Sequence, residues 1–134
     1  MRKIAGFHLM ELMIVLAIIS ILSMFAIPIY TQYLVKERRL EAAQLLSKIS
    51  IAAEQYHLEQ GSYQAMTLAA LHADEYAVKD NYQFILELQS DVDYVLIAKP
   101  IHAQADDDRY CGSLSLDSSG KRGVSGVGGI DGCW

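Results

Sequence analysis

The chain has 134 residues and a net charge of −5, so it is long enough for one small domain in addition to an apolar N-terminal segment. The acidity lies in residues 61–134, where five Lys/Arg face eleven Asp/Glu, a net charge of −6. Such a surface repels phosphate backbones, which weighs against nucleic-acid binding through a broad basic face. Two short basic stretches, at residues 36–39 and 121–122, are the exceptions.

The chain begins with a short basic stretch, and an apolar run from Leu12 to Ile29 follows, with the single acid Glu11 at its head. The run is about as long as a bilayer-spanning helix requires, roughly 20 residues. A carboxylate at the border of hydrocarbon is costly, so Glu11 is expected to have a task. No small-x-small pair for a signal peptidase occurs between residues 17 and 29, so we expect this segment to be retained.

Residues 6–15, Gly-Phe-His-Leu-Met-Glu-Leu-Met-Ile-Val, resemble the cleavage motif of type IV pilins and pseudopilins. The resemblance implies that residues 1–6 are a leader, which a prepilin peptidase removes between Gly6 and Phe7 before methylating the new N-terminus at Phe7. Glu11 would then pair with the N-terminal amine of a neighbouring subunit, a strong contact in a low-dielectric core. The alternative is that Glu11 is a solvated flank at the headgroup level. His8 stands where the family usually has Thr or Ser, and Met10 where it often has Ile.

Residues 7–30 are predicted to form a transmembrane or filament-core helix, and residues 31–60 its amphipathic continuation, which ends near Glu59. Pro28 removes one backbone hydrogen bond and lies where the family carries a helix-bending proline. Arg38 and Arg39 are expected on a solvated face, or else interlocked with an acidic patch of a neighbouring subunit. The apolar face is predicted from residues at helical spacing, namely Leu34, Leu45, Ile49, Ala52 and Tyr56.

Residues 61–134 are expected to form a globular head. Gly61 is typical of a helix end, and a short helix is expected around residues 66–72. Strands are predicted at 82–88, 94–99, 112–117 and 121–125, with a turn at Ser119-Gly120 and with Pro100 at a strand end or edge. The predicted fold class is α+β, in which the long N-terminal helix packs on a small antiparallel sheet with a disulfide-pinned C-terminal loop.

The chain has two cysteines, Cys111 and Cys133. Outside the cytoplasm such a pair predicts a disulfide, with two reduced thiols as the alternative. A zinc site is less favoured because no histidine lies near them in the sequence. The stretch 111–117 and the ending Cys133-Trp134 also resemble the C-terminal region of minor pilins from type IVa systems.

The sequence shows no catalytic constellation, so we expect no enzymatic activity, no cofactor and no metal. The four histidines are scattered without ligand spacing. The run 106–108 is expected to be a solvated acidic turn, with a calcium site as the alternative that its spacing does not favour.

The function that the resemblance implies is that of a structural subunit, a minor pilin that is built into or primes a type IV pilus. The expected partners are major and minor pilin subunits, prepilin peptidase, inner-membrane assembly proteins and, before assembly, the lipid bilayer. Nucleic acid is not expected as a partner. The subunit would first span the bacterial inner membrane once, with its head in the periplasm, and later lie in the extracellular pilus. Two alternatives remain, a pseudopilin of a type II secretion system and a DNA-capturing pilin of natural transformation.

Overall fold

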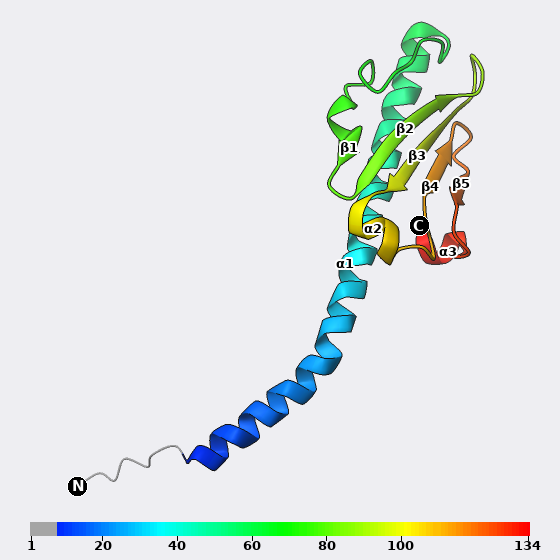
Figure 1. Ribbon diagram of the computed structural model, residues 1–134. Helices are drawn as coiled ribbons and strands as arrows, with labels where there is room; N and C mark the ends of the chain where they lie inside the picture. Colours follow the sequence, from blue (N-terminus) through cyan, green and yellow to red (C-terminus); the bar gives the residue numbers. More distant parts are fainter. Residues whose placement is uncertain (1–7) are drawn as a thin grey trace. The chain divides into compact units, whose positions relative to one another are not determined.

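The computed structural model describes residues 8–134 and contains one long helix, a five-stranded antiparallel sheet and three short helical segments (Figure 1). The chain divides into two compact units, one ending at Leu34 and the other running from Val35 to Trp134, and each is described by itself. The predicted fold class is confirmed. The elements are α1 (Leu9–Gln60), η1 (Asp74–Tyr76), β1 (Val78–Lys79), β2 (Tyr82–Leu88), β3 (Tyr94–Pro100), α2 (His102–Asp107), β4 (Leu114–Asp117), β5 (Arg122–Val124) and α3 (Ile130–Cys133).

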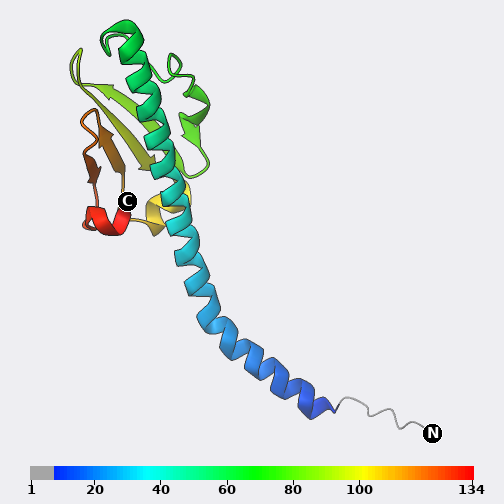
Figure 2. The same cartoon turned by 180° about the vertical axis from the view of Figure 1, so that it is seen from behind.

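Each strand of the sheet pairs with the strand that precedes it, in the order β1-β2-β3-β4-β5. Burial alternates along β3, where Tyr94, Leu96 and Ala98 are buried, because successive side chains of a strand point to opposite faces. The second half of α1 crosses this buried face (Figure 2). Pro100 ends β3 beyond the last residue paired with β4, where its missing N–H costs no ladder bond on that side.

The buried face of α1 is rotated relative to the prediction. Of the five residues expected there, only Ile49 is fully buried. Leu45, Ala52 and Tyr56 are partly buried against the core, and Leu34 belongs to the first unit. Alanines allow the sheet to approach the helix closely, whereas the sequence argument gave most weight to large apolar residues. The residues of α1 that are buried are Arg39, Ala42, Ala43, Leu46, Ile49 and Ala53.

The first unit consists, in its described part, of α1 up to Leu34. Its most apolar window has a mean hydropathy of 2.8, and none of that window is buried. Two serine hydroxyls donate hydrogen bonds to backbone carbonyls one turn earlier, Ser20 Oγ to Leu16 O and Ser23 Oγ to Ile19 O. Pro28 lies inside the helix and supplies no N–H. The length and composition of this segment suit a membrane span, and its apolar side chains have no cover within the described residues.

The loop after α1 differs from the prediction. Gly61 ends α1 with a positive φ of 78°, as expected. The expected short helix at residues 66–72 is wrong, because this stretch makes a single turn, which stops at His72 with φ 52°. The sequence reasoning also missed the short elements β1, α2 and α3, all too brief to show a clear period.

Candidate functional site

The N-terminal assembly residues lie at the start of α1. Gly6 and Phe7 are outside the described residues, so the cleavage and methylation predictions concern a part of the chain without a described structure. Glu11 lies in the first turn of α1 and is exposed, as are its apolar neighbours on the helix. This segment is therefore a rod of apolar side chains with one acid near its start, and lipid or other helices could cover it.

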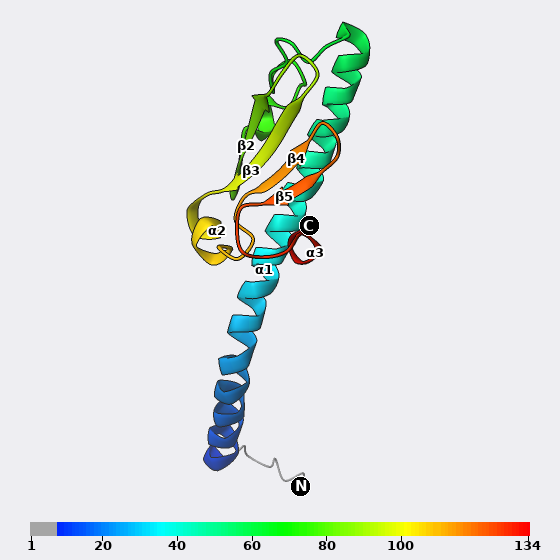
Figure 3. The same cartoon turned by 90° about the vertical axis from the view of Figure 1, so that its right-hand side faces the viewer.

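Helices α2 and α3 lie at the end of the second unit where its part of α1 begins (Figure 3), and the disulfide belongs to this end. It joins Cys111, which follows α2, to Cys133 in α3, and both residues are only 1% exposed. The predicted disulfide is thus present. Two backbone hydrogen bonds run beside it, from Gly126 N to Cys111 O (3.0 Å) and from Gly128 N to Tyr110 O (2.7 Å). Together these bonds hold the glycine-rich tail against the segment that follows α2.

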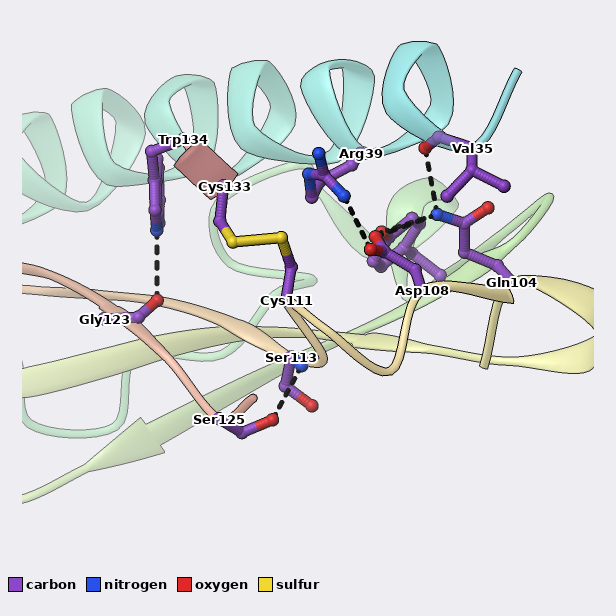
Figure 4. The surroundings of a disulfide bond; sticks show 11 residues. Val35, Arg39, Gln104, Asp108, Cys111, Ser113, Gly123, Ser125, Cys133 and Trp134 are labelled. Carbon is purple, nitrogen blue, oxygen red and sulfur yellow. Dashed lines mark hydrogen bonds and ion pairs between the residues drawn. A yellow bond between two sulfur atoms is a disulfide. The ribbon is translucent and has the colours of Figure 1, made fainter. Parts of the chain in front are cut away.

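Trp134 fixes the tail to the last strand (Figure 4). Its indole Nε1–H donates to Gly123 O of β5 at 3.0 Å. The guanidinium of Arg122 lies 5.1 Å from the centre of the Trp134 ring, within the range of a cation–π contact. The tail is therefore anchored at the disulfide and again at this tryptophan.

A buried polar cluster ties α1 to α2 beside the disulfide (Figure 4). Arg39 Nη1 forms an ion pair with Asp108 Oδ1, and the two side chains are 10% and 3% exposed. Gln104 is fully buried, and the two N–H donors of its Nε2 are shared among three acceptors, Val35 O (3.1 Å), Tyr82 OH (3.1 Å) and Asp108 Oδ2 (3.2 Å). Such a network rigidifies a packing contact when most of its members are satisfied.

This cluster corrects two predictions. Arg39 was expected on a solvated face, yet it is buried, and Asp108, the residue that follows α2, supplies its carboxylate partner. The acidic turn is solvated only at Asp106 and Asp107, while Asp108 points inward. Asp108 and Arg39 are 69 positions apart in the sequence, and no local sequence pattern predicts an ion pair between such distant residues.

Burial raises the pKa of the Tyr82 hydroxyl to about 12, although the hydrogen bond from Gln104 opposes this shift. The carboxylate of Asp108 adds to it, since a second negative charge beside Asp108 would be repelled. Tyr82 therefore remains neutral over the physiological pH range, and its hydroxyl donates to Asp108 Oδ2 at 3.4 Å.

A shallow hollow of about 230 Å³ lies over β3, β4 and β5 and has two cationic residues at its rim, Lys121 and Arg122. Neither has a carboxylate within 4 Å in the described part of the chain, where the ion pairs are those of Arg39, Lys79 and Arg109. Asp117 lines the hollow too, but its Oδ1 accepts from Ser119 and from the backbone of Lys121, and the Ser119 bond lowers the pKa of Asp117.

Metal ligation has no support in the geometry of residues 8–134. Within that range, no three His, Cys, Asp or Glu side chains are close enough together to hold an ion. The carboxylate of Asp108, which the calcium alternative requires, is already bound by Arg39 and Gln104.

Comparisons with known proteins agree with this architecture. Residues 28–115 match the family model described as "Type IV minor pilin ComP, DNA uptake sequence receptor". The fimbrial protein of Neisseria meningitidis serogroup A is 33% identical over 87 residues, which cover 65% of this chain and 51% of that protein. Fimbrial protein EcpC of Eikenella corrodens is 40% identical over 65 residues, 48% of this chain and 42% of that protein. The chain thus spans about half the length of the curated relatives it matches.

Among solved structures, the fold is similar to that of the non-core minor pilin PilV of Neisseria meningitidis, with a TM-score of 0.56 and 19% identity. The match covers 70% of this chain and 89% of the PilV chain, and at this identity it supports the fold alone. The family match extends over more than half of the chain, from Pro28, at the end of the apolar run of α1, to Ser115 in strand β4. The chain therefore belongs to the ComP family of type IV minor pilins.

Proposed function

We propose that this minor pilin is held in the inner membrane by α1 with its head in the periplasm, and is then incorporated into a type IV pilus. The observation that carries the proposal is the uncovered apolar part of α1, which continues into a disulfide-bonded head. A rod of this kind is stable in lipid or among other rods, and its exposure to water would be costly. A pseudopilin would have the same rod, and family membership favours the pilus.

The partners in this proposal follow from the two states of the rod. Prepilin peptidase would act at Gly6-Phe7 in the membrane-held state, and inner-membrane assembly proteins would transfer the subunit into the fibre. In the fibre, Glu11 would pair with the N-terminal amine of an adjacent major or minor pilin. Because both charges lie in a low-dielectric surrounding there, a subunit out of register would leave an unpaired charge, which costs several kcal/mol, roughly 3–5. No enzymatic activity is part of the proposal.

Glu11→Ala tests this proposal, with Glu37→Ala as the matched control, since Glu37 is an exposed acid further along the same helix. We expect both variants to be cleaved before Phe7, as N-terminal sequencing of the mature chains would show. Glu11→Ala should be depleted from sheared pili relative to the membrane fraction, and Glu37→Ala should not. Normal incorporation of Glu11→Ala would refute the pairing.

A second function, contact of the head with duplex DNA, is favoured by the hollow between β3 and β5. Lys121 and Arg122 at its rim have no carboxylate within 4 Å in the described part of the chain, and the carboxylate of Asp117, which lines the same hollow, is hydrogen-bonded within its own turn. The net charge of −6 over residues 61–134 confines such a contact to a local site. The family description names a DNA uptake sequence receptor, which agrees with a local site of this kind.

Duplex binding by the full chain in detergent, measured at two salt concentrations, tests this second function. Lys121→Ala should weaken binding and reduce the dependence of log affinity on log salt by about one unit, the value for one lost phosphate contact. Lys99→Ala is the matched control, because Lys99 is an exposed lysine of β3 that does not line the hollow. An equal effect of both variants would show that any binding is non-specific, and absence of binding would refute the function.

A further inference from the structure

Three exposed apolar side chains gather around the disulfide at one end of the second unit. They are Tyr110, Val127 and Ile130, with exposed fractions of 63%, 89% and 43%, and we call them the base patch. The loop that carries Val127 lies beside the segment that carries Tyr110, because Gly128 N donates to Tyr110 O. Ile130 begins α3, which the disulfide joins to the same segment. Figure 3 shows α2 and α3 at the same end of the unit.

The exposure of this patch is built into the structure. A Cβ on Gly128 would lie 2.7 Å from both the Tyr110 ring and Cys133 Sγ, so the loop is seated tightly on its neighbours. A Cβ on Gly126 would lie 2.2 Å from Tyr110 O. Val127 lies between these two closely packed glycines, and its side chain is 89% exposed, without cover from residues 8–134.

The part of α1 that belongs to this end of the second unit follows the apolar run closely in the sequence. Gln104 of α2 binds Val35 O, and Val35 lies only six positions after Ile29, the last residue of the run. At about 1.5 Å per residue, this part of α1 is roughly 9 Å long. The headgroup layer of one leaflet is about 5–8 Å thick. Tyr30 and Tyr33, 62% and 64% exposed, are of the residue type that marks this layer.

We propose that the base patch inserts into the headgroup layer of the bilayer that holds α1. Three side chains are too few for a stable protein interface, which buries about 800 Å² per partner. They suffice for a lipid contact, because α1 already keeps the chain at the surface and the second contact is intramolecular. The proposal rests on the membrane-held state proposed above and adds that the head is docked on the lipid before assembly.

Methyl NMR of the full chain in lipid nanodiscs tests this proposal, with a gadolinium chelate attached to the lipid headgroups. The methyl signals of Val127 and Ile130 should lose most of their intensity. Val92 is the matched control, since it is a 62% exposed valine in the turn between β2 and β3 and lies outside the patch. Its signal should be retained. In Val127→Asp, the Ile130 signal should return toward that of the wild type without gadolinium.

The outcomes separate this proposal from the proposed function. Broadening of methyls in the apolar run of α1, such as those of Ile18 and Ile27, reports that the chain is anchored in the membrane. If these signals broaden while Val127 and Ile130 behave like Val92, the base patch does not contact lipid and the proposal is overturned. If none of them broadens, the anchoring itself fails. The wild-type comparison requires no variant, so a folding defect of Val127→Asp would leave the test intact.

Discussion

Removing the charge of Asp108 is expected to destabilise the head severely. Asp108→Asn keeps the shape of the side chain but leaves Arg39, whose side chain is 10% exposed, without a counterion. Breaking a buried ion pair at one partner costs about 3–5 kcal/mol, because the other charge remains buried. That is a large share of the roughly 5–15 kcal/mol that stabilises a domain. Asp107→Asn, one residue away and exposed, should change stability by no more than about 0.5 kcal/mol.

The double variant Arg39→Met/Asp108→Leu should be less destabilised than Asp108→Asn. Arg39 Nε and Gln104 Oε1 have no hydrogen-bond partner among the described residues, so the cluster is incompletely satisfied and an apolar replacement loses less. The assay is urea unfolding of the full chain in detergent micelles, followed by Trp134 fluorescence. A loss of unfolding free energy in Asp108→Asn no larger than that in Asp107→Asn would contradict the role of the ion pair. So would a loss in Arg39→Met/Asp108→Leu equal to the sum of the losses in Arg39→Met and Asp108→Leu measured singly.

Three other predictions concern the tail and the pH range. Cys111→Ser should cost about 3 kcal/mol and release tail fragments on limited proteolysis, and an unchanged digestion pattern would contradict this. Gly128→Ala should lower the unfolding midpoint, because its Cβ would lie 2.7 Å from the Tyr110 ring, whereas Gly132→Ala, with nothing within 4 Å, should leave it unchanged. Because the pKa of Tyr82 is about 12 in the folded chain and about 10 when unfolded, the stability it contributes is complete below pH 10 and falls between pH 10 and 12. The loss of stability between pH 10 and 12 should be smaller in Tyr82→Phe, but not absent, because burial also raises the pKa of Tyr63 and of Tyr94.

Two kinds of feature could be predicted from the sequence. They are segments with a sustained pattern of apolar residues, and single positions whose residue type determines the local structure. Strand β2 has the predicted bounds, and β3 extends one residue beyond its prediction, because apolar and β-branched residues fill both stretches. Gly61 marked the end of α1 by its ability to take a positive φ. The disulfide followed from two cysteines in a segment expected to leave the cytoplasm.

What could not be predicted depends on contacts between distant residues. The sequence around Arg39 shows an exposed basic stretch, and only the position of α2 turns this residue into a buried partner of Asp108. The same holds for Gln104, a polar residue that is fully buried because three acceptors converge on its amide. In α1, half of the buried residues are alanines, because the sheet lies close to the helix. The sizes of the side chains in the sequence do not indicate which face of the helix is buried.

The strand order has a consequence for how the head forms. Because every strand of the meander neighbours its predecessor, the sheet can grow hairpin by hairpin without waiting for remote segments. The amphipathic half of α1, however, is synthesised before any strand. Its alanine-rich face therefore remains uncovered until the sheet forms. The nascent polypeptide is therefore most vulnerable to aggregation until β3 emerges, and early insertion of the oily segment into lipid would protect it during that interval.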